Sequence, residues 1–326
     1  MTGTVRNSGF QPAWWLPGPH LQTLWPALCR RLPPVGVRRE RLELADGDFV
    51  DLDWSLNPAG PVVVILHGLE GSSASGYARG LLAAAVGRGW RAVVLHFRGC
   101  SGQPNRLARS YNAGDTVDLA AVVEELRRRE PATPLAAVGY SLGGNVLLKW
   151  LGETPHGPLA AAAAVSVPFV LDLAAQRLQR GFSRLYQRHL LRNLKAAYRR
   201  KFRHRGDLPL PLAGLAGLGD FYAFDDRVTA PLHGYAGVHD YYARASCRPY
   251  LKNIRTPTLI LHALDDPFML PAVVPDAAGL SPWVTLELSR HGGHVGFVAG
   301  RLPWRPRYWL EERIPAFLAG PLGSDC

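Results

Sequence analysis

One stretch decides the fold of this chain of 326 residues, and it is Gly139-Tyr140-Ser141-Leu142-Gly143. An apolar run precedes it at residues 135–138, and apolar residues at helical spacing follow it from Val146 to Leu151. The pattern predicts a strand, a sharp turn with the serine at its apex, and then a helix. Glycines beside the serine let the strand and the helix approach each other, because they carry no Cβ atom. We interpret the serine as a nucleophile, against the alternative of a structural glycine and serine turn.

Apolar runs and amphipathic segments alternate along most of the chain. Such alternation is typical of an α/β fold, with a mostly parallel, doubly wound sheet between helices. A hairpin comes first, with strands over residues 41–44 and 49–54 and its turn at 45–47. The other expected strands are 62–66, 92–95, 135–138, 158–167, 258–261 and 284–288, and the expected helices are 77–86, 116–129 with Asp115 as N-cap, and 308–318.

The alternation stops after Val167 and returns near Thr258. Apolar residues keep helical spacing from Leu171 to Phe202, while arginines fill the other faces, so we expect an inserted helical lid here. The opening of the chain is rich in Trp and Pro and is expected to pack on the domain as an ordered arm. The expected division is an arm over 1–36, an α/β core over 37–168 and 253–326, and a lid over 169–252.

The positive charge of the chain is concentrated in one segment. The net charge is +11, and residues 171–205 hold eleven Lys and Arg side chains against one acidic residue. This basic lid could contact an anionic membrane surface peripherally, and a solvated helix face is the alternative. We expect no nucleic-acid partner, because aromatic residues do not interleave with the basic ones as a stacking platform requires.

The cysteines and the apolar runs of the chain indicate the cellular compartment in which the protein works. Cys29, Cys100, Cys247 and Cys326 are scattered and show no zinc-binding spacing, which is typical of a reduced, intracellular protein. Residues 1–9 lack an apolar core, and the longest apolar run, 159–171, is too short to span a bilayer. We therefore expect a cytoplasmic protein without a secretory signal.

A serine nucleophile needs a base within hydrogen-bond reach and an acid that orients the base. Two loops that follow predicted strands supply candidates, Ala263-Leu-Asp-Asp-Pro-Phe268 and His291-Gly-Gly-His-Val-Gly-Phe297. The carboxyl ends of parallel strands meet at one edge of a sheet, so both loops are expected beside Ser141.

Each loop offers two candidates. We favour His294 over His291 as the base, because it follows the Gly-Gly turn and can point back across the sheet edge. We favour Asp266 over Asp265 as the acid, because it lies nearer the proline of its loop. The other carboxylate is expected to cap a helix or to support the site from behind.

Backbone amides are expected to bind the oxyanion of the reaction. One is the amide that follows the nucleophile, that of Leu142. The second is the amide of Leu69, in the loop His67-Gly-Leu-Glu-Gly71, whose glycines allow amides to face inward. A plain glycine-rich turn is the alternative for this loop.

Seven stretches together are specific to one family. They are the arm from Pro12 to Trp25, HGLEGS at 67–72, FRGCSG at 97–102, GYSLGGN at 139–145, FDDRVTAP at 224–231, ALDDPF at 263–268 and HGGHVGF at 291–297. With these motifs the chain resembles the YheT-like branch of the α/β-hydrolases over nearly its whole length. This resemblance implies that Ser141, Asp266 and His294 form a catalytic triad. Members are mostly assigned as carboxylesterases, and eukaryotic relatives are implicated in hydrolysis of phospholipids or monoacylglycerols and in synthesis of medium-chain acyl esters.

We therefore expect a serine carboxylic ester hydrolase that acts in lipid metabolism. Its substrate would be a small-molecule ester or a lipid ester with a short to medium acyl chain, cleaved through an acyl-enzyme. No metal and no organic cofactor are expected. Two alternatives stay open: an acyltransferase in which an alcohol replaces water, and a non-catalytic lipid-binding protein on the same fold.

Overall fold

Nine strands form one sheet within residues 2–323, the part of the chain that the computed structural model describes. Residue 1 of the expected arm and residues 324–326 of the last expected core segment lie outside this range. The order across the sheet is β1-β9-β8-β7-β6-β4-β5-β3-β2. The strands are β1 (Thr4–Asn7), β2 (Val37–Glu43), β3 (Phe49–Ser55), β4 (Val62–Leu66), β5 (Arg91–His96), β6 (Leu135–Tyr140), β7 (Ala161–Val165), β8 (Thr258–Ala263) and β9 (Val284–Ser289).

Most neighbouring strands run parallel. β4 pairs in parallel with β5 and β6, and parallel pairing continues through β7, β8, β9 and β1. β3 runs antiparallel to both β2 and β5, as the predicted hairpin requires. The predicted α/β-hydrolase fold with its mostly parallel, doubly wound sheet is therefore confirmed.

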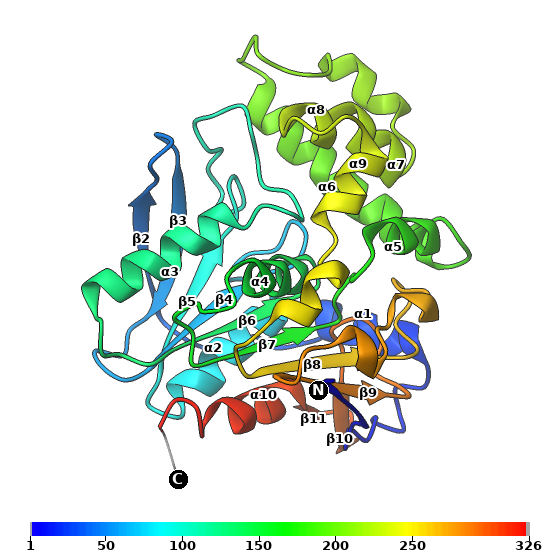
Figure 1. Ribbon diagram of the computed structural model, residues 1–326. Coiled ribbons are helices and arrows are strands. Elements are labelled where there is room, and N and C mark those ends of the chain that lie inside the picture. Colours follow the sequence, from blue (N-terminus) through cyan, green and yellow to red (C-terminus); the bar gives the residue numbers. More distant parts are fainter. Residues whose placement is uncertain (1, 324–326) are drawn as a thin grey trace.

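Helices cover both faces of the sheet (Figure 1). On one face α2 (Gly76–Val86) and α10 (Leu310–Leu318) pack over Val63 and Ile65 of β4, and on the other α3 (Val117–Arg129) and α4 (Leu142–Glu153) pack over Val62, Val64 and Leu66. All five residues of β4 are buried. This explains why the central strands appear in the sequence as continuous apolar runs rather than as alternating ones.

Several local predictions need correction. β7 is shorter than the expected 158–167. Asp115 does not cap α3: Thr116 holds the cap position without a side-chain cap bond, and the Asp115 carboxylate instead accepts a hydrogen bond from Arg109. The helix expected at 308 begins only at Leu310, because residues 305–308 form a strand.

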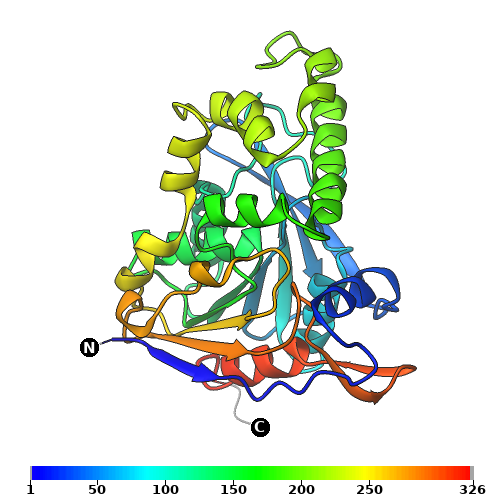
Figure 2. The same ribbon diagram turned by 90° about the vertical axis from the view of Figure 1, so that its right-hand side faces the viewer.

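Four elements near the chain ends have no counterpart in the predictions. β1 adds an edge strand to the sheet beside β9, and α1 (Pro19–Leu28) lies within the predicted arm. β10 (Val298–Leu302) and β11 (Arg305–Tyr308) form a separate antiparallel hairpin. Figure 2 shows this hairpin projecting from the body of the molecule, with α1 beside it.

The segment between β7 and β8 carries helices and rises above the carboxyl edge of the sheet (Figures 1 and 2). The single helical pattern expected from Leu171 to Phe202 is interrupted where Gly181 adopts a φ of 53°. Phe182 and Leu185, two of the apolar residues at that spacing, are 46% and 49% exposed. The helices are α5 (Leu171–Leu178), α6 (Ser183–Phe202), α7 (Phe221–Phe224), α8 (Ala230–Leu232) and α9 (Val238–Ala245), with 3-10 turns at Leu212–Gly217 and Arg248–Asn253 and a π turn at Asp225–Thr229.

Candidate active site

Ser141 lies at the turn between β6 and α4. Its backbone has φ 51° and ψ −118°, a conformation that residues with side chains rarely adopt. Neighbouring glycines are required by close contacts, since a Cβ atom at Gly139 would lie 2.4 Å from the carbonyl oxygen of Gly143. A Cβ atom at Gly143 would in turn lie 2.5 Å from the carbonyl oxygen of His67. The turn thus presents the serine hydroxyl at the carboxyl edge of the sheet.

Three of the predicted site residues lie in hydrogen-bond contact. His294 Nε2 is 3.0 Å from Ser141 Oγ, and His294 Nδ1 is 2.8 Å from Asp266 Oδ2. Asp266 is 3% exposed, and its second carboxylate oxygen accepts a hydrogen bond of 2.8 Å from the amide of Phe268. When Nδ1 donates its proton to the carboxylate, Nε2 is left to accept the serine proton. This arrangement can deprotonate Ser141.

Asp265 and His291, the candidates that were not favoured, lie near the contact between Asp266 and His294 but are not part of it. Asp265 accepts a hydrogen bond of 3.0 Å from the amide of Gly293 and lies 3.4 Å from Nδ1 of His291. Burial raises the pKa of the Asp265 carboxyl. Asp265 therefore ties its own loop to the Gly-Gly turn that precedes His294.

Two backbone amides near Ser141 have no acceptor within residues 2–323. In the loop after β4, Gly68 donates to the hydroxyl of Tyr77, Glu70 donates to the hydroxyl of Tyr111, and Gly71 donates to the carbonyl of Gly68. The amide of Leu69, between them, donates to no acceptor in the described residues. The amide of Leu142 opens α4, where the first amides of a helix have no partner within it. Both amides predicted for the oxyanion are thus available.

A buried histidine supports the loop of Leu69. His67 Nδ1 donates to the carbonyl of Gly68 at 2.7 Å, and Nε2 accepts from the amide of Phe97 at 3.2 Å. Burial lowers the pKa of His67 to about 3, so the ring is neutral and can play both roles. Glu70 follows Leu69 in this loop. Its carboxylate accepts a hydrogen bond of 2.8 Å from the hydroxyl of Tyr111, and burial raises the pKa of the Glu70 carboxyl.

Helix α1 of the arm supports the histidine loop. Thr23 Oγ1 accepts a hydrogen bond of 2.9 Å from the amide of His294 and donates one of 2.7 Å to the carbonyl of Pro19. The buried side chain of Gln22 exchanges two hydrogen bonds with the backbone of Val298, of 3.0 and 2.8 Å. The bonds from the arm to His294 and to Val298 join residues more than 270 positions apart in the sequence. The arm is therefore part of the site.

Aromatic rings pack against the imidazole ring of His294. The ring of Phe268 stacks on that of His294, with 3.9 Å between centroids and 2° between planes. Tyr186 of α6 packs on Phe268, and its hydroxyl lies 3.0 Å from Nδ1 of His20 in α1. The lid, the arm and the histidine loop thus meet at one point.

A cavity of about 570 Å³ opens beside Ser141. Its lining includes residues from α1, α5 and α6 and from the loops around the serine. Polar groups are also present, and burial lowers the pKa of Lys201 to about 7. The apolar part of the lining includes Leu171, Leu178, Leu190, Leu194, Phe224 and Val228. Such a cavity can receive an apolar chain next to the serine.

Residues 61–300 match the profile of the family described as alpha/beta hydrolase fold. The chain is also 50% identical over 305 residues to the Escherichia coli protein named "Putative esterase YheT", covering 92% of this chain and 89% of that protein. The chain belongs to the alpha/beta hydrolase family. The predicted resemblance to its YheT-like branch is confirmed, which places this chain among the hydrolases of that superfamily.

More distant relatives of this hydrolase carry names that refer to lipids. The human protein named phospholipase ABHD3 is 31% identical over 315 residues, covering 93% of this chain and 77% of that protein. The Saccharomyces cerevisiae protein named monoacylglycerol lipase is 31% identical over 268 residues, covering 80% of this chain and 59% of that protein. Among solved structures, the Pyrococcus furiosus esterase Pf2001 shares the fold with a TM-score of 0.58 at 17% identity, covering 99% of this chain and 98% of that one.

Arg98 of this hydrolase anchors two parts of the fold to each other. Its buried guanidinium donates to Asp118 of α3 at 2.8 and 2.6 Å and to Asp48 before β3 at 3.1 Å. It therefore fastens the β2–β3 hairpin to the helix behind the site.

In the described residues no three His, Cys, Asp or Glu side chains are grouped to hold a metal ion. Nor does any helix in that part of the chain combine the length and apolar character needed to cross a membrane.

Three residues of the site were not predicted, namely Thr23, Gln22 and Phe268. Thr23 and Gln22 lie in the arm, for which only ordered packing was expected. Phe268 ends the motif that contains Asp266, and its place beside the acid was the one signal that could have pointed to it.

Proposed function

We propose that this hydrolase cleaves carboxylic esters with Ser141 as nucleophile, His294 as general base and acid, and Asp266 as the group that orients the histidine. The observation that carries the proposal is the continuous contact from Asp266 through His294 to Ser141, beside two unpaired amides. This is the arrangement that serine hydrolases of unrelated folds share.

The reaction proceeds in two halves. Ser141 Oγ attacks the ester carbonyl carbon and gives its proton to His294 Nε2, while the amides of Leu69 and Leu142 bind the developing oxyanion. The intermediate collapses, the bond to the alcohol breaks, and the alcohol takes the proton from Nε2. Water then gives a proton to Nε2 and attacks the acyl carbonyl carbon. The bond to Ser141 Oγ breaks, Oγ takes the proton back from Nε2, and the acid is released.

The proposed substrates are lipid esters or esters with short to medium acyl chains. The apolar residues of α5 and α6 in the cavity lining support an acyl site, because they remove the chain from water. Relatives named phospholipase and monoacylglycerol lipase support the same substrate class.

The first test is labelling by a fluorophosphonate probe, which reacts with activated serines. Wild type should be labelled and Ser141→Ala should not. Asp266→Asn should lose roughly four orders of magnitude in kcat for a p-nitrophenyl ester, because the histidine loses its orienting acceptor. Asp265→Asn is the matched control, since it removes a neighbouring carboxylate that does not contact His294, and it should stay within about tenfold.

Two outcomes would contradict the proposal. One is labelling that persists in Ser141→Ala, which would place the reactive serine elsewhere. The other is a larger loss in Asp265→Asn than in Asp266→Asn, which would exchange their roles. A series of p-nitrophenyl esters then measures acyl preference, and products formed with added alcohol show whether water or an alcohol is the preferred acceptor.

A further inference from the structure

The arm and the β10–β11 hairpin both expose large apolar side chains. Trp14 is 76% exposed, Trp304 is 74% exposed and Leu302 is 41% exposed. The indole nitrogen of Trp14 donates to the carbonyl of Arg301 at 3.0 Å, and that of Trp15 donates to the carbonyl of Gly300 at 3.1 Å. These bonds fix the arm against the hairpin. Exposed aromatic rings on a fixed scaffold are typical of a surface that docks on a partner.

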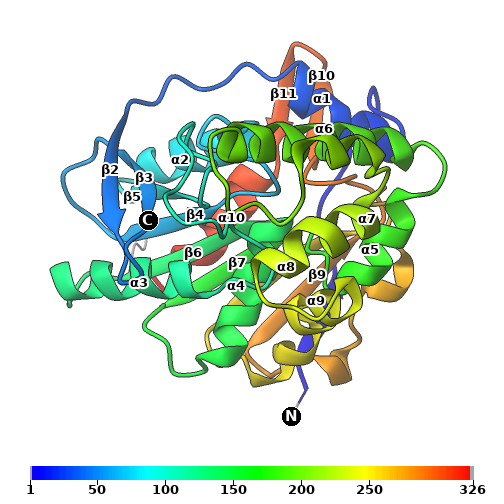
Figure 3. The same cartoon turned by 90° about the horizontal axis from the view of Figure 1, so that it is seen from above.

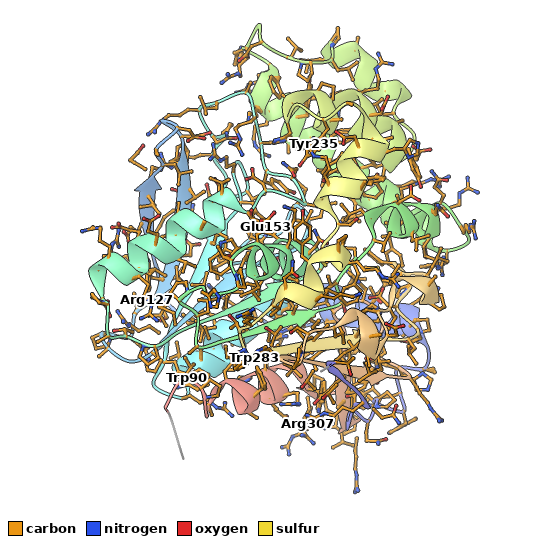
Figure 4. All side chains as sticks on the ribbon, in the orientation of Figure 1. Trp90, Arg127, Glu153, Tyr235, Trp283 and Arg307 are labelled. Atoms are coloured by element: carbon orange, nitrogen blue, oxygen red, sulfur yellow. The ribbon has the colours of Figure 1, made fainter. Side chains whose placement is uncertain are left out.

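The charge around these rings identifies the kind of partner. Residues 288–310 contain no acidic side chain, and Arg301, Arg305 and Arg307 of the hairpin are exposed. Arg307, labelled in Figure 4, pairs with Glu312. Arg301 and Arg305 have no acidic partner in the described part of the chain. Tryptophan and arginine are the side chains that favour the boundary between lipid headgroups and acyl chains.

The same side of the molecule carries further basic and apolar groups. Figures 2 and 3 both place α1, α6 and the hairpin along one side. Leu28 of α1 is 77% exposed. Helix α6 contains no acidic residue. Its exposed basic side chains, none of which pairs with an acid within residues 2–323, include Arg184, Arg188, Arg192, Arg199 and Arg200.

We propose that this face docks the protein on the surface of an anionic lipid bilayer, with Trp14 and Trp304 inserted at the headgroup boundary. Arg301 and Arg305 beside the rings and the arginines of α6 would contact anionic headgroups. Since α1 and α6 also line the cavity beside Ser141, docking brings the cavity next to lipid. The docking face itself contains no part of the catalytic contact, so binding is testable even if the proposed chemistry is wrong.

The test is co-sedimentation of the full chain with vesicles. The Ser141→Ala variant serves as the background, so that the lipids stay intact. Vesicles of phosphatidylglycerol and phosphatidylcholine in equal parts are compared with phosphatidylcholine alone, at low and at high salt. Binding is expected on the mixed vesicles, weakened by salt because exposed charges are screened.

Substitutions locate the docking face. Trp304→Ala, at a ring without a hydrogen bond to any other residue of 2–323, should weaken binding about tenfold or more. Arg301→Gln and Arg305→Gln should each weaken it about fivefold. Trp283→Ala is the matched control: Trp283 is 52% exposed and precedes β9, whose first residues lie near the N-terminus, away from the hairpin (Figures 3 and 4). It should bind like the unchanged chain.

Folding is checked by thermal unfolding of each variant and, in the wild-type background, by hydrolysis of a water-soluble short-chain ester, which Trp304→Ala should leave unchanged. Three results would overturn the proposal. They are absence of vesicle binding by the folded protein, equal loss in Trp304→Ala and Trp283→Ala, and self-association that Trp304→Ala abolishes without any binding to lipid. The last result would make this face a contact between two copies of the chain.

Discussion

The contact between Thr23 and the amide of His294 offers a sharp test of how the arm serves the site. Thr23→Val keeps the shape of the side chain but removes the oxygen that accepts this hydrogen bond. The amide of His294 is then left without an acceptor in a partly buried position. We expect the histidine loop to spend more time displaced from Ser141, and kcat to fall accordingly.

The size of the effect follows from the energy of the lost contact. Leaving a buried donor unpaired costs about 1–3 kcal/mol. If this cost is relieved when the loop moves away, the competent arrangement becomes less populated, and kcat falls about 5- to 150-fold. KM should change by less than about threefold, because Thr23 is not among the apolar side chains of α5 and α6 proposed to hold the acyl chain. Thr23→Ser keeps the hydroxyl and should restore kcat to within about twofold.

The assay measures kcat and KM for a soluble ester, the rate of fluorophosphonate labelling and the temperature of unfolding for wild type and both variants. Labelling should slow in parallel with kcat, because the probe also needs an activated serine. An unchanged kcat in Thr23→Val with a lower unfolding temperature would refute the reasoning. The contact would then stabilise the fold without positioning His294.

Two further predictions concern stability. Burial raises the pKa of Asp225 in the lid to about 6, so the folded state holds its proton more tightly than the unfolded chain, and its contribution to stability falls as pH rises through about 6. Between about pH 4 and pH 8, Asp225→Asn should gain about 2 kcal/mol relative to wild type in urea unfolding, and a constant difference across this range would contradict it. Ser141→Gly should be about 1 kcal/mol more stable than Ser141→Ala, because glycine tolerates the φ of 51°, and equal stabilities would show that the turn stores no strain.

Much of the fold was predictable because its signals are local. A strand buried on both faces appears as a continuous apolar run, and the glycines around Ser141 record how closely β6 and α4 approach. The expectation that Asp266, His294 and Ser141 meet followed from topology, since loops at the carboxyl ends of parallel strands share one edge. None of these inferences needed knowledge of a distant side chain.

Other features had no local signal. Helical spacing is the same for one helix as for two, so the break between α5 and α6 at Gly181 could not be read from the apolar pattern. β1 is exposed along its length and gains its structure from pairing with β9, which lies about 280 residues away. Asp115 looked like a helix cap because its type fits, but Arg109 pairs with its carboxylate instead.

The sequence by itself determined the alternation of strands and helices, the turn that carries Ser141, the family, and the two pairs that contain the proposed acid and base. Only the tertiary structure decided that Asp266 rather than Asp265 contacts His294, that the amides of Leu69 and Leu142 remain unpaired, and that the arm supports the histidine loop. The reason is physical. Local patterns record which face of an element is buried, whereas a hydrogen bond depends on where a distant segment places its partner.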